Sequence, residues 1–174
     1  GHSLGGNLVL NYSLRRKPEL KGVIATSPWL KLAFQPPAVK VGLGRMMNKI
    51  APAFSQASEL DTAELSYDPA VVTAYVNDPL VHDKISARLF VSTYESGLYA
   101  FEHAAEFPLP LLLMHGADDR ITSAEASRQF GAAGPKYVTT RIWEKCRHEV
   151  HNEAVKGEFI QTMVGWLDEQ VKTK

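Results

Sequence analysis

The chain has 174 residues, which suits one domain, and 45% of them are hydrophobic, which is enough to fill a core. Its 19 acidic and 19 basic residues cancel, and this balance excludes the electrostatic attraction on which binding to nucleic acid depends. Cys146 is the single cysteine, so no internal disulfide framework is possible, and no apolar run has the length of a membrane span.

A Gly-x-Ser-x-Gly motif opens the chain, with Ser3 between Gly1 and Gly5 and with Gly6 next in sequence. In this motif the serine occupies a strained turn between a strand and a helix, so the flanking residues must be small. Residues 7–16 space apolar side chains at helical intervals, and Pro18 follows. The pattern predicts a nucleophile elbow; the alternative is a Gly/Ser loop that precedes a helix.

Predicted strands and helices alternate over the rest of the chain, which favours an α/β fold with a parallel sheet. The predicted strands are 21–28, 110–116 and 138–143, and the predicted helices after the first are 124–130 and 157–171. Thr122 and Glu125 form a capping-box pattern at the start of the second helix. On the last helix we expect an inner side made of Phe159, Ile160, Met163, Val164, Trp166 and Leu167.

Residues 29–107 interrupt this alternation with several helical patterns and no convincing strand, which predicts an inserted helical cap. The domain boundaries are therefore 1–28 for the first part of the core, 29–107 for the cap and 108–174 for the rest of the core. Apolar residues recur at helical spacing at Val39, Leu43, Met46, Met47 and Ile50. A lid that covers the pocket is the favoured interpretation of this helix, and a lid that docks on a lipid surface is the alternative.

Ser3, an aspartate and a histidine occur in that order along the chain, and the aspartate and the histidine each follow a predicted strand. A serine hydroxyl needs a histidine to take its proton, and the histidine needs a carboxylate to fix its tautomer. The order serine, acid, histidine is that of the α/β-hydrolases. Asp118 and Asp119 are the candidate acids, and His148 and His151 are the candidate bases. The remaining histidines have structural interpretations: His2 supports the elbow, while His82, His103 and His115 belong to the cap or to strand ends.

The chain resembles the monoacylglycerol lipase branch of the α/β-hydrolase fold, a group also described as serine-aminopeptidase-like or lysophospholipase-like. The resemblance covers essentially the whole chain and is carried by GHSLGG at 1–6, NDPLVH at 77–82, PLLLMHGADDRIT at 110–122 and CRHEVHNE at 146–153. It implies Ser3 as nucleophile, Asp119 of an HGxxD motif as acid and His148 as base. Arg147 stands where the family often has tyrosine.

This resemblance implies hydrolysis of a lipid ester, monoacylglycerol or lysophospholipid, through an acyl-enzyme, with no metal and no organic cofactor. It implies the Leu4 amide as one donor of the oxyanion hole, and a second donor from a segment before the elbow. We expect substrate contacts in the cap from Trp29, Leu30, Leu43 and Met46. A short-chain carboxylesterase, a proline-type aminopeptidase and a non-catalytic lipid- or partner-binding module are the alternatives.

Early strands of the fold precede the elbow, so we expect the sheet of this chain to be incomplete and the isolated chain to fold poorly or to aggregate. The expected partner is a small lipid ester, with peripheral membrane contact through the cap as an open alternative. A location in the cytoplasm or at the membrane periphery is favoured. Nothing in the sequence indicates the oligomeric state.

Overall fold

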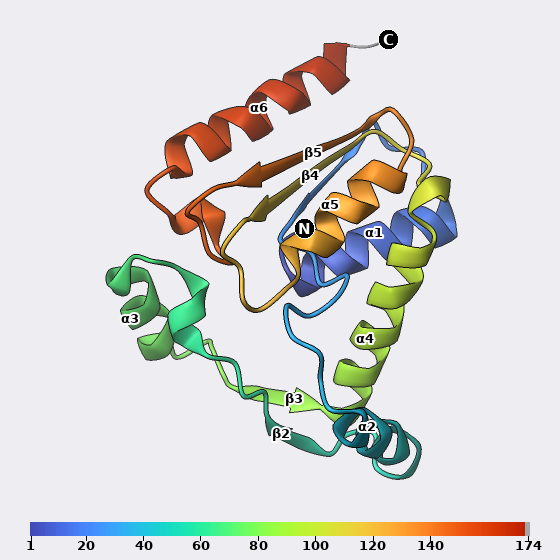
Figure 1. Cartoon of the computed structure of the whole chain (residues 1–174), viewed down its shortest axis with the longest axis vertical. Helices are drawn as coiled ribbons and strands as arrows, with labels where there is room; N and C mark the ends of the chain where they lie inside the picture. The colour runs from blue at the N-terminus through green and yellow to red at the C-terminus, as the bar shows by residue number, and fades with distance from the viewer. Residues whose placement is uncertain (173–174) are drawn as a thin grey trace.

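A parallel sheet of three strands forms the centre of the computed structural model, which describes residues 1–172 (Figure 1). The strands are β1 (Val23–Thr26), β4 (Leu111–Gly116) and β5 (Val138–Trp143), in the order β1-β4-β5. Ile24 pairs with Leu112, and Leu112 pairs with Thr139. The predicted parallel sheet is confirmed, and the strand bounds differ from the predicted ones by no more than a few residues.

The middle strand β4 is buried along its whole length, as its continuous apolar sequence predicts. Leu111 and Leu113 face a core shared with α1 (Leu4–Arg16), α4 (Ala87–Glu102) and α5 (Ala124–Ala133). Leu112 and Met114 face the other side, where α6 (Lys156–Lys172) covers the sheet. Figure 1 shows this arrangement, with α6 on one face and α1 and α5 on the other.

The inner side of α6 is narrower than its sequence predicts. Phe159 and Trp166 are buried against the sheet, but Ile160, Val164 and Leu167 are exposed. Each of the three exposed residues directly follows Phe159, Met163 or Trp166 in sequence. One step along a helix turns the side chain to a different face, so these three side chains point toward solvent. The apolar pattern of α6 therefore spans more than the face that packs on the sheet.

The predicted cap contains α2 (Ala38–Ile50), the 3₁₀ helix η1 (Thr62–Leu65) and α3 (Pro69–Asn77). It also contains an antiparallel pair, β2 (Ser55–Ala57) and β3 (Lys84–Ser86), so the expectation of no strand is wrong. Three-residue strands with exposed or half-exposed side chains leave no alternating pattern to detect. The last part of the segment, with Ala100, Ala104 and Phe107, packs into the core.

Short 3₁₀ helices complete the fold: η2 (Ala104–Glu106) follows α4, and η3 (Val150–Asn152) precedes α6. Within residues 1–172, no helix combines the length and the apolar character needed to cross a bilayer.

Candidate active site

Ser3 occupies a tight turn between the start of the chain and α1. Its φ of 53° lies in the left-handed region, and its amide donates to the Thr26 carbonyl at 2.9 Å. A Cβ on Gly6 meets the Pro28 Cβ at 2.8 Å, and a Cβ on Gly1 meets the Gly6 nitrogen at 3.0 Å, whereas a Cβ on Gly5 has nothing within 4 Å. The turn therefore requires glycine at positions 1 and 6, and not at Gly5 as the motif led us to expect.

Asp119 and His148 form a buried hydrogen-bonded pair, with 2.7 Å between Asp119 Oδ2 and His148 Nδ1. The other oxygen, Oδ1, accepts from the amides of Ile121 at 2.8 Å and Thr122 at 3.0 Å. Burial by itself raises the pKa of Asp119, but hydrogen bonds from His115 and His148 outweigh burial and hold this pKa below its usual range. Asp119 is therefore an ionised carboxylate whose two oxygens are fixed.

The neighbouring Asp118 has a different environment, because its Oδ2 accepts from the Tyr67 hydroxyl of the cap at 3.0 Å. His151 is half-buried, and burial lowers its pKa. The geometry thus brings Asp119 and His148 together, as the sequence predicts, and leaves the alternative residues outside the pair. Within residues 1–172, the Ser3 hydroxyl forms no hydrogen bond to any side chain, His148 included.

The end of β1 connects all three segments that carry the candidate residues. Thr26 accepts from the Ser3 amide, and the next residue, Ser27, donates through Oγ to the His148 carbonyl at 2.8 Å. Thr122 is close to Asp119 in sequence, and its hydroxyl can donate to the Ser27 carbonyl, 3.1 Å away. Ser27 is fully buried and has a φ of 43°. Sequence reasoning missed Ser27, since nothing local marks a serine at a strand end as part of a site.

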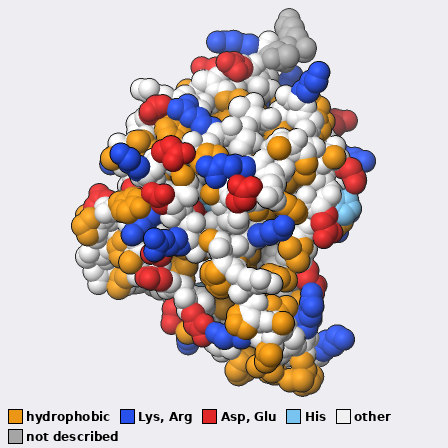
Figure 2. All heavy atoms as spheres, in the orientation of Figure 1, with side chains coloured by type: hydrophobic (Ala, Val, Ile, Leu, Met, Phe, Trp, Pro, Cys, Tyr) orange, Lys and Arg blue, Asp and Glu red, His pale blue; other side chains and the backbone are white. Residues whose placement is uncertain are grey.

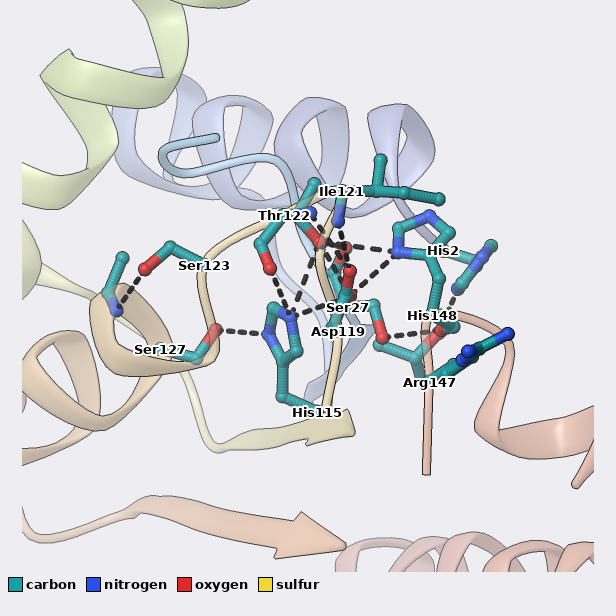
Figure 3. A network of polar contacts seen from close by, with 12 residues as sticks. His2, Ser27, His115, Asp119, Ile121, Thr122, Ser123, Ser127, Arg147 and His148 are labelled. Carbon is teal, nitrogen blue, oxygen red and sulfur yellow. Dashed lines mark hydrogen bonds and ion pairs between the residues drawn. The ribbon is translucent and has the colours of Figure 1, made fainter. Parts of the chain in front are cut away.

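The prediction that Thr122 caps α5 is wrong by one residue. Ser123 is the N-cap, and its Oγ accepts from the Ala126 amide at 3.1 Å. The Thr122 hydroxyl instead lies 2.9 Å from Asp119 Oδ2 (Figure 3). A threonine and a serine in succession both suit a cap, and the choice between them depends on the nearby carboxylate, which local sequence does not reveal.

His2 lies beside the candidate base. Its ring centroid is 4.8 Å from that of His148 and 4.9 Å from that of His151, and its Nδ1 is 3.0 Å from the Thr26 hydroxyl. Burial, together with the neighbouring His148 and His151, lowers the pKa of His2 to about 3. His2 is therefore neutral near pH 7 and adds no charge next to His148, while its contact with Thr26 agrees with the predicted support of the elbow.

The residues predicted to bind substrate are dispersed. Leu4 is the first residue of α1, and Trp29 is half-buried with its ring centroid 6.2 Å from that of Phe90. Leu30 is 1% exposed and belongs to the core cluster, so it presents no surface to a ligand in this structure. Leu43 and Met46 lie on the solvent-facing side of α2. Within residues 1–172, no group of three or more histidine, cysteine, aspartate or glutamate side chains is placed to hold a metal ion.

The cap contacts the His148 loop directly. The Arg147 guanidinium lies 4.2 Å from the centre of the Tyr67 ring, and its Nε is 3.6 Å from a carboxylate oxygen of Glu64. The buried Glu153 accepts from the amides of both Tyr67 and Arg147, at 3.1 and 3.0 Å. One side of the loop thus faces the sheet and the other side faces η1 and the residues after it.

The sequence and the fold of the chain resemble those of known proteins. The family model described as serine aminopeptidase, S33, matches residues 1–155. An uncharacterised abhydrolase domain-containing protein of Dictyostelium discoideum is 38% identical over 99% of the chain and 19% of its own length. A monoacylglycerol lipase of Mycolicibacterium smegmatis is 29% identical over 96% of the chain and 60% of its own length.

Among solved structures, the monoacylglycerol lipase of Paleococcus ferrophilus superposes with a TM-score of 0.93 at 34% identity, over 98% of the chain and 67% of that protein. The fold expected from the sequence is therefore confirmed. The chain spans between about a fifth and two thirds of the length of these three proteins.

Proposed function

Because the chain belongs to the serine aminopeptidase S33 family of α/β-hydrolases, we propose that it acts as a serine ester hydrolase with Ser3, Asp119 and His148 as its catalytic triad. The observation that carries the proposal is the buried pair of Asp119 and His148 beside an elbow serine with a left-handed backbone. All three residues are anchored to the last residues of β1 and to the residue that follows it, directly or through Thr122.

The hydrogen bonds assign the protons of the proposed reaction. His148 Nδ1 faces the ionised Asp119 Oδ2 and therefore carries hydrogen, which leaves Nε2 free to take the Ser3 proton. Ser3 Oγ then attacks the ester carbonyl, the alcohol leaves with the proton from His148, and water releases the acyl group by the same steps. The Leu4 amide, at the start of α1, is one proposed donor to the negative oxygen of the tetrahedral intermediate.

A fluorophosphonate probe tests the nucleophile, because it reacts with an activated serine and adds a defined mass. We expect labelling of the protein, studied together with any coding sequence that precedes Gly1, and loss of labelling in Ser3→Ala. Ser13→Ala is a matched control, since Ser13 is a buried serine of α1 whose hydroxyl bonds the Val9 carbonyl. Equal labelling of the wild type and Ser3→Ala contradicts the proposed nucleophile, and absence of labelling in both favours a non-catalytic binding module.

We propose a lipid ester, monoacylglycerol or lysophospholipid, as the substrate. Relatives named as monoacylglycerol lipases support this class, as does the apolar composition of the cap. The test compares 1-oleoylglycerol, a lysophosphatidylcholine, 4-nitrophenyl butyrate and a prolyl arylamide at equal concentration. Preference for the first two supports the proposal, preference for the butyrate indicates a short-chain carboxylesterase, and preference for the arylamide indicates an aminopeptidase.

The outer face of α2 supports contact with an aggregated lipid substrate. Val39, Leu43, Met46 and Ile50 follow each other at helical spacing and are 82%, 53%, 48% and 72% exposed. Figure 2 shows apolar side chains gathered at the end of the molecule where Figure 1 places α2. Such a stripe on one helix is typical of an interfacial helix. This observation favours the docking alternative over a lid whose apolar face only covers a pocket.

Co-sedimentation with phosphatidylcholine vesicles tests this contact. We expect the double substitution Leu43→Ser, Ile50→Ser to lower the bound fraction at least threefold. Leu80→Ser is the matched control, because Leu80 is 90% exposed and lies outside α2. Equal loss in both variants, or no loss in either, contradicts a specific role of α2.

A further inference from the structure

His115 is a fully buried histidine that contacts the proposed catalytic acid from the side opposite His148. It is the residue before the last one of β4, and its Nε2 lies 2.9 Å from Asp119 Oδ2. Its Nδ1 lies 2.7 Å from the hydroxyl of Ser127 in α5. Figure 3 shows Asp119 between the two histidines. Sequence analysis assigned His115 to a strand end with a structural role only.

The neighbours of His115 determine where its hydrogens lie. Nε2 faces Asp119 Oδ2 at 2.9 Å and, at 3.3 Å, both the carbonyl oxygen and the hydroxyl of Thr122. The carboxylate and carbonyl oxygens can only accept, and the Thr122 hydroxyl has nearer acceptors for its single hydrogen in Asp119 Oδ2 and the Ser27 carbonyl. Nε2 must therefore carry hydrogen. The Ser127 hydroxyl can donate to Nδ1, so the neutral ring satisfies both of its nitrogens.

The hydrogen positions of His148 follow from the same argument, because its Nδ1 donates to the same oxygen, Asp119 Oδ2, at 2.7 Å. Two imidazole rings therefore share one carboxylate oxygen, while the other oxygen is held by the Ile121 and Thr122 amides. Without the bond from His115, Oδ2 keeps the His148 ring and the Thr122 hydroxyl, 2.9 Å away, as its donors, and rotation about the Cβ–Cγ bond is less restrained. The bond from His115 opposes this rotation and keeps Oδ2 directed at His148.

We infer that His115 is a positioning residue, which holds the Asp119 carboxylate in the orientation that fixes the His148 tautomer. This inference rests on the proposed function for its kinetic consequence, though the shared carboxylate oxygen exists whatever the reaction. His115 does not touch the reacting atoms, so its removal slows the chemical step and leaves substrate binding unchanged. The effect is carried by a hydrogen bond to a charged group, which belongs to the stronger class of hydrogen bonds.

Two substitutions separate the hydrogen bond from the volume of the side chain. His115→Gln keeps an N–H donor at nearly the position of Nε2, whereas His115→Met is similar in length and has no donor. We expect His115→Met to lower kcat for 4-nitrophenyl butyrate by about 10- to 100-fold, with KM within about twofold of wild type. His115→Gln is expected to recover most of the loss. The rate is expressed per active site titrated with fluorophosphonate, so unfolded material does not count.

His103→Gln is the matched control, because the His103 ring bonds the Tyr99 carbonyl and stacks on the Tyr99 ring, with no contact to Asp119. Should His115→Met not fold, Ser127→Ala tests the same chain of bonds from the other end, and we expect a several-fold lower kcat. Equal kcat in folded His115→Met and wild type overturns the inference, as does equal loss in His115→Met and His115→Gln.

A proton NMR experiment on imidazole-labelled protein tests the inference even if Ser3 is not a nucleophile. We expect the hydrogen-bonded Nδ1 proton of His148 to shift in His115→Met and to return near its original position in His115→Gln. An unchanged His148 resonance in His115→Met overturns the shared carboxylate. A shifted resonance in a protein that fluorophosphonate does not label instead supports the positioning contact and contradicts the proposed nucleophile.

Discussion

A methyl group at Gly116 tests how the end of β4 determines the position of the His148 loop. Gly116 is the last residue of β4, and a Cβ added there collides with the backbone carbonyl groups of Cys146 and Arg147, with the Cys146 carbonyl carbon at 2.9 Å. Carbon atoms pack best at about 3.5–4.0 Å, so the loop must retreat by about 1 Å. His148 follows Arg147 directly and moves with it.

This displacement has a kinetic and a thermodynamic cost. A misplacement of about 1 Å at a catalytic group lowers the rate by about 100-fold, and overpacking a tight site lowers the free energy of unfolding by about 1–3 kcal/mol. We therefore expect Gly116→Ala to react with fluorophosphonate about 100-fold more slowly than wild type. The variant should remain folded, with a lower midpoint in urea.

Gly165→Ala is the matched control, because a Cβ on Gly165 of α6 has nothing within 4 Å. Alanine is the better helix former, so this variant should gain up to about 1 kcal/mol of stability with unchanged labelling. Labelling of Gly116→Ala at the wild-type rate, with an unchanged urea midpoint, refutes the argument that the glycine lets the loop approach β4.

Three further predictions follow from the site. Asp119→Asn should slow fluorophosphonate labelling by about 10⁴-fold because it removes the charge that supports His148, while Asp118→Asn should stay within about threefold of wild type; equal effects contradict the assignment of the acid. His2 has a pKa of about 3 against an unfolded value of 6.5, so the unfolded chain binds the proton first as pH falls. His2 therefore lowers the free energy of unfolding by about 2 kcal/mol as the pH falls from 8 to 5. In urea titrations, the free energy of unfolding should depend less on pH in His2→Gln, whereas His82→Gln, a control at an exposed site, should behave like wild type. Gly6→Ala should abolish fluorophosphonate labelling, measured by intact mass, because its methyl group clashes with Pro28, whereas Gly5→Ala should label normally. Loss of labelling in Gly5→Ala but not in Gly6→Ala contradicts the steric argument for the elbow.

The sequence could predict those parts of the site that are determined by a few consecutive residues. The elbow at residues 1–6 and the strand before Asp119 are local patterns, since turn sterics and strand burial depend on immediate neighbours. The order of Ser3, Asp119 and His148 along the chain predicted that they lie close together, because the carboxyl ends of parallel strands meet at one edge of the sheet. The structure confirms that Asp119 and His148 meet there.

Residues that act across the sheet could not be predicted in this way. Ser27 joins the His148 carbonyl over 121 residues of chain, and this contact exists only once β1 and the loop after β5 are assembled. His115 was given only a structural role at a strand end, because its contact with Asp119 depends on how the following loop folds back. Leu30 was assigned to the substrate channel on hydrophobicity alone, which does not distinguish a core face from a pocket wall.

The loop that carries His148 shows why the site depends on both the core and the cap. On the sheet side, Ser27 bonds the His148 carbonyl, and Gly116 permits close backbone contact. On the cap side, the buried Glu153 binds the amides of Tyr67 and Arg147. The carboxylate of Glu153 is thus shared between the two parts, so it links a shift of the cap to a shift of the loop, beside the contacts that Arg147 makes with Tyr67 and Glu64. Removing its charge should loosen both at once, and this coupling follows from the contacts without any role for Glu153 in the chemistry.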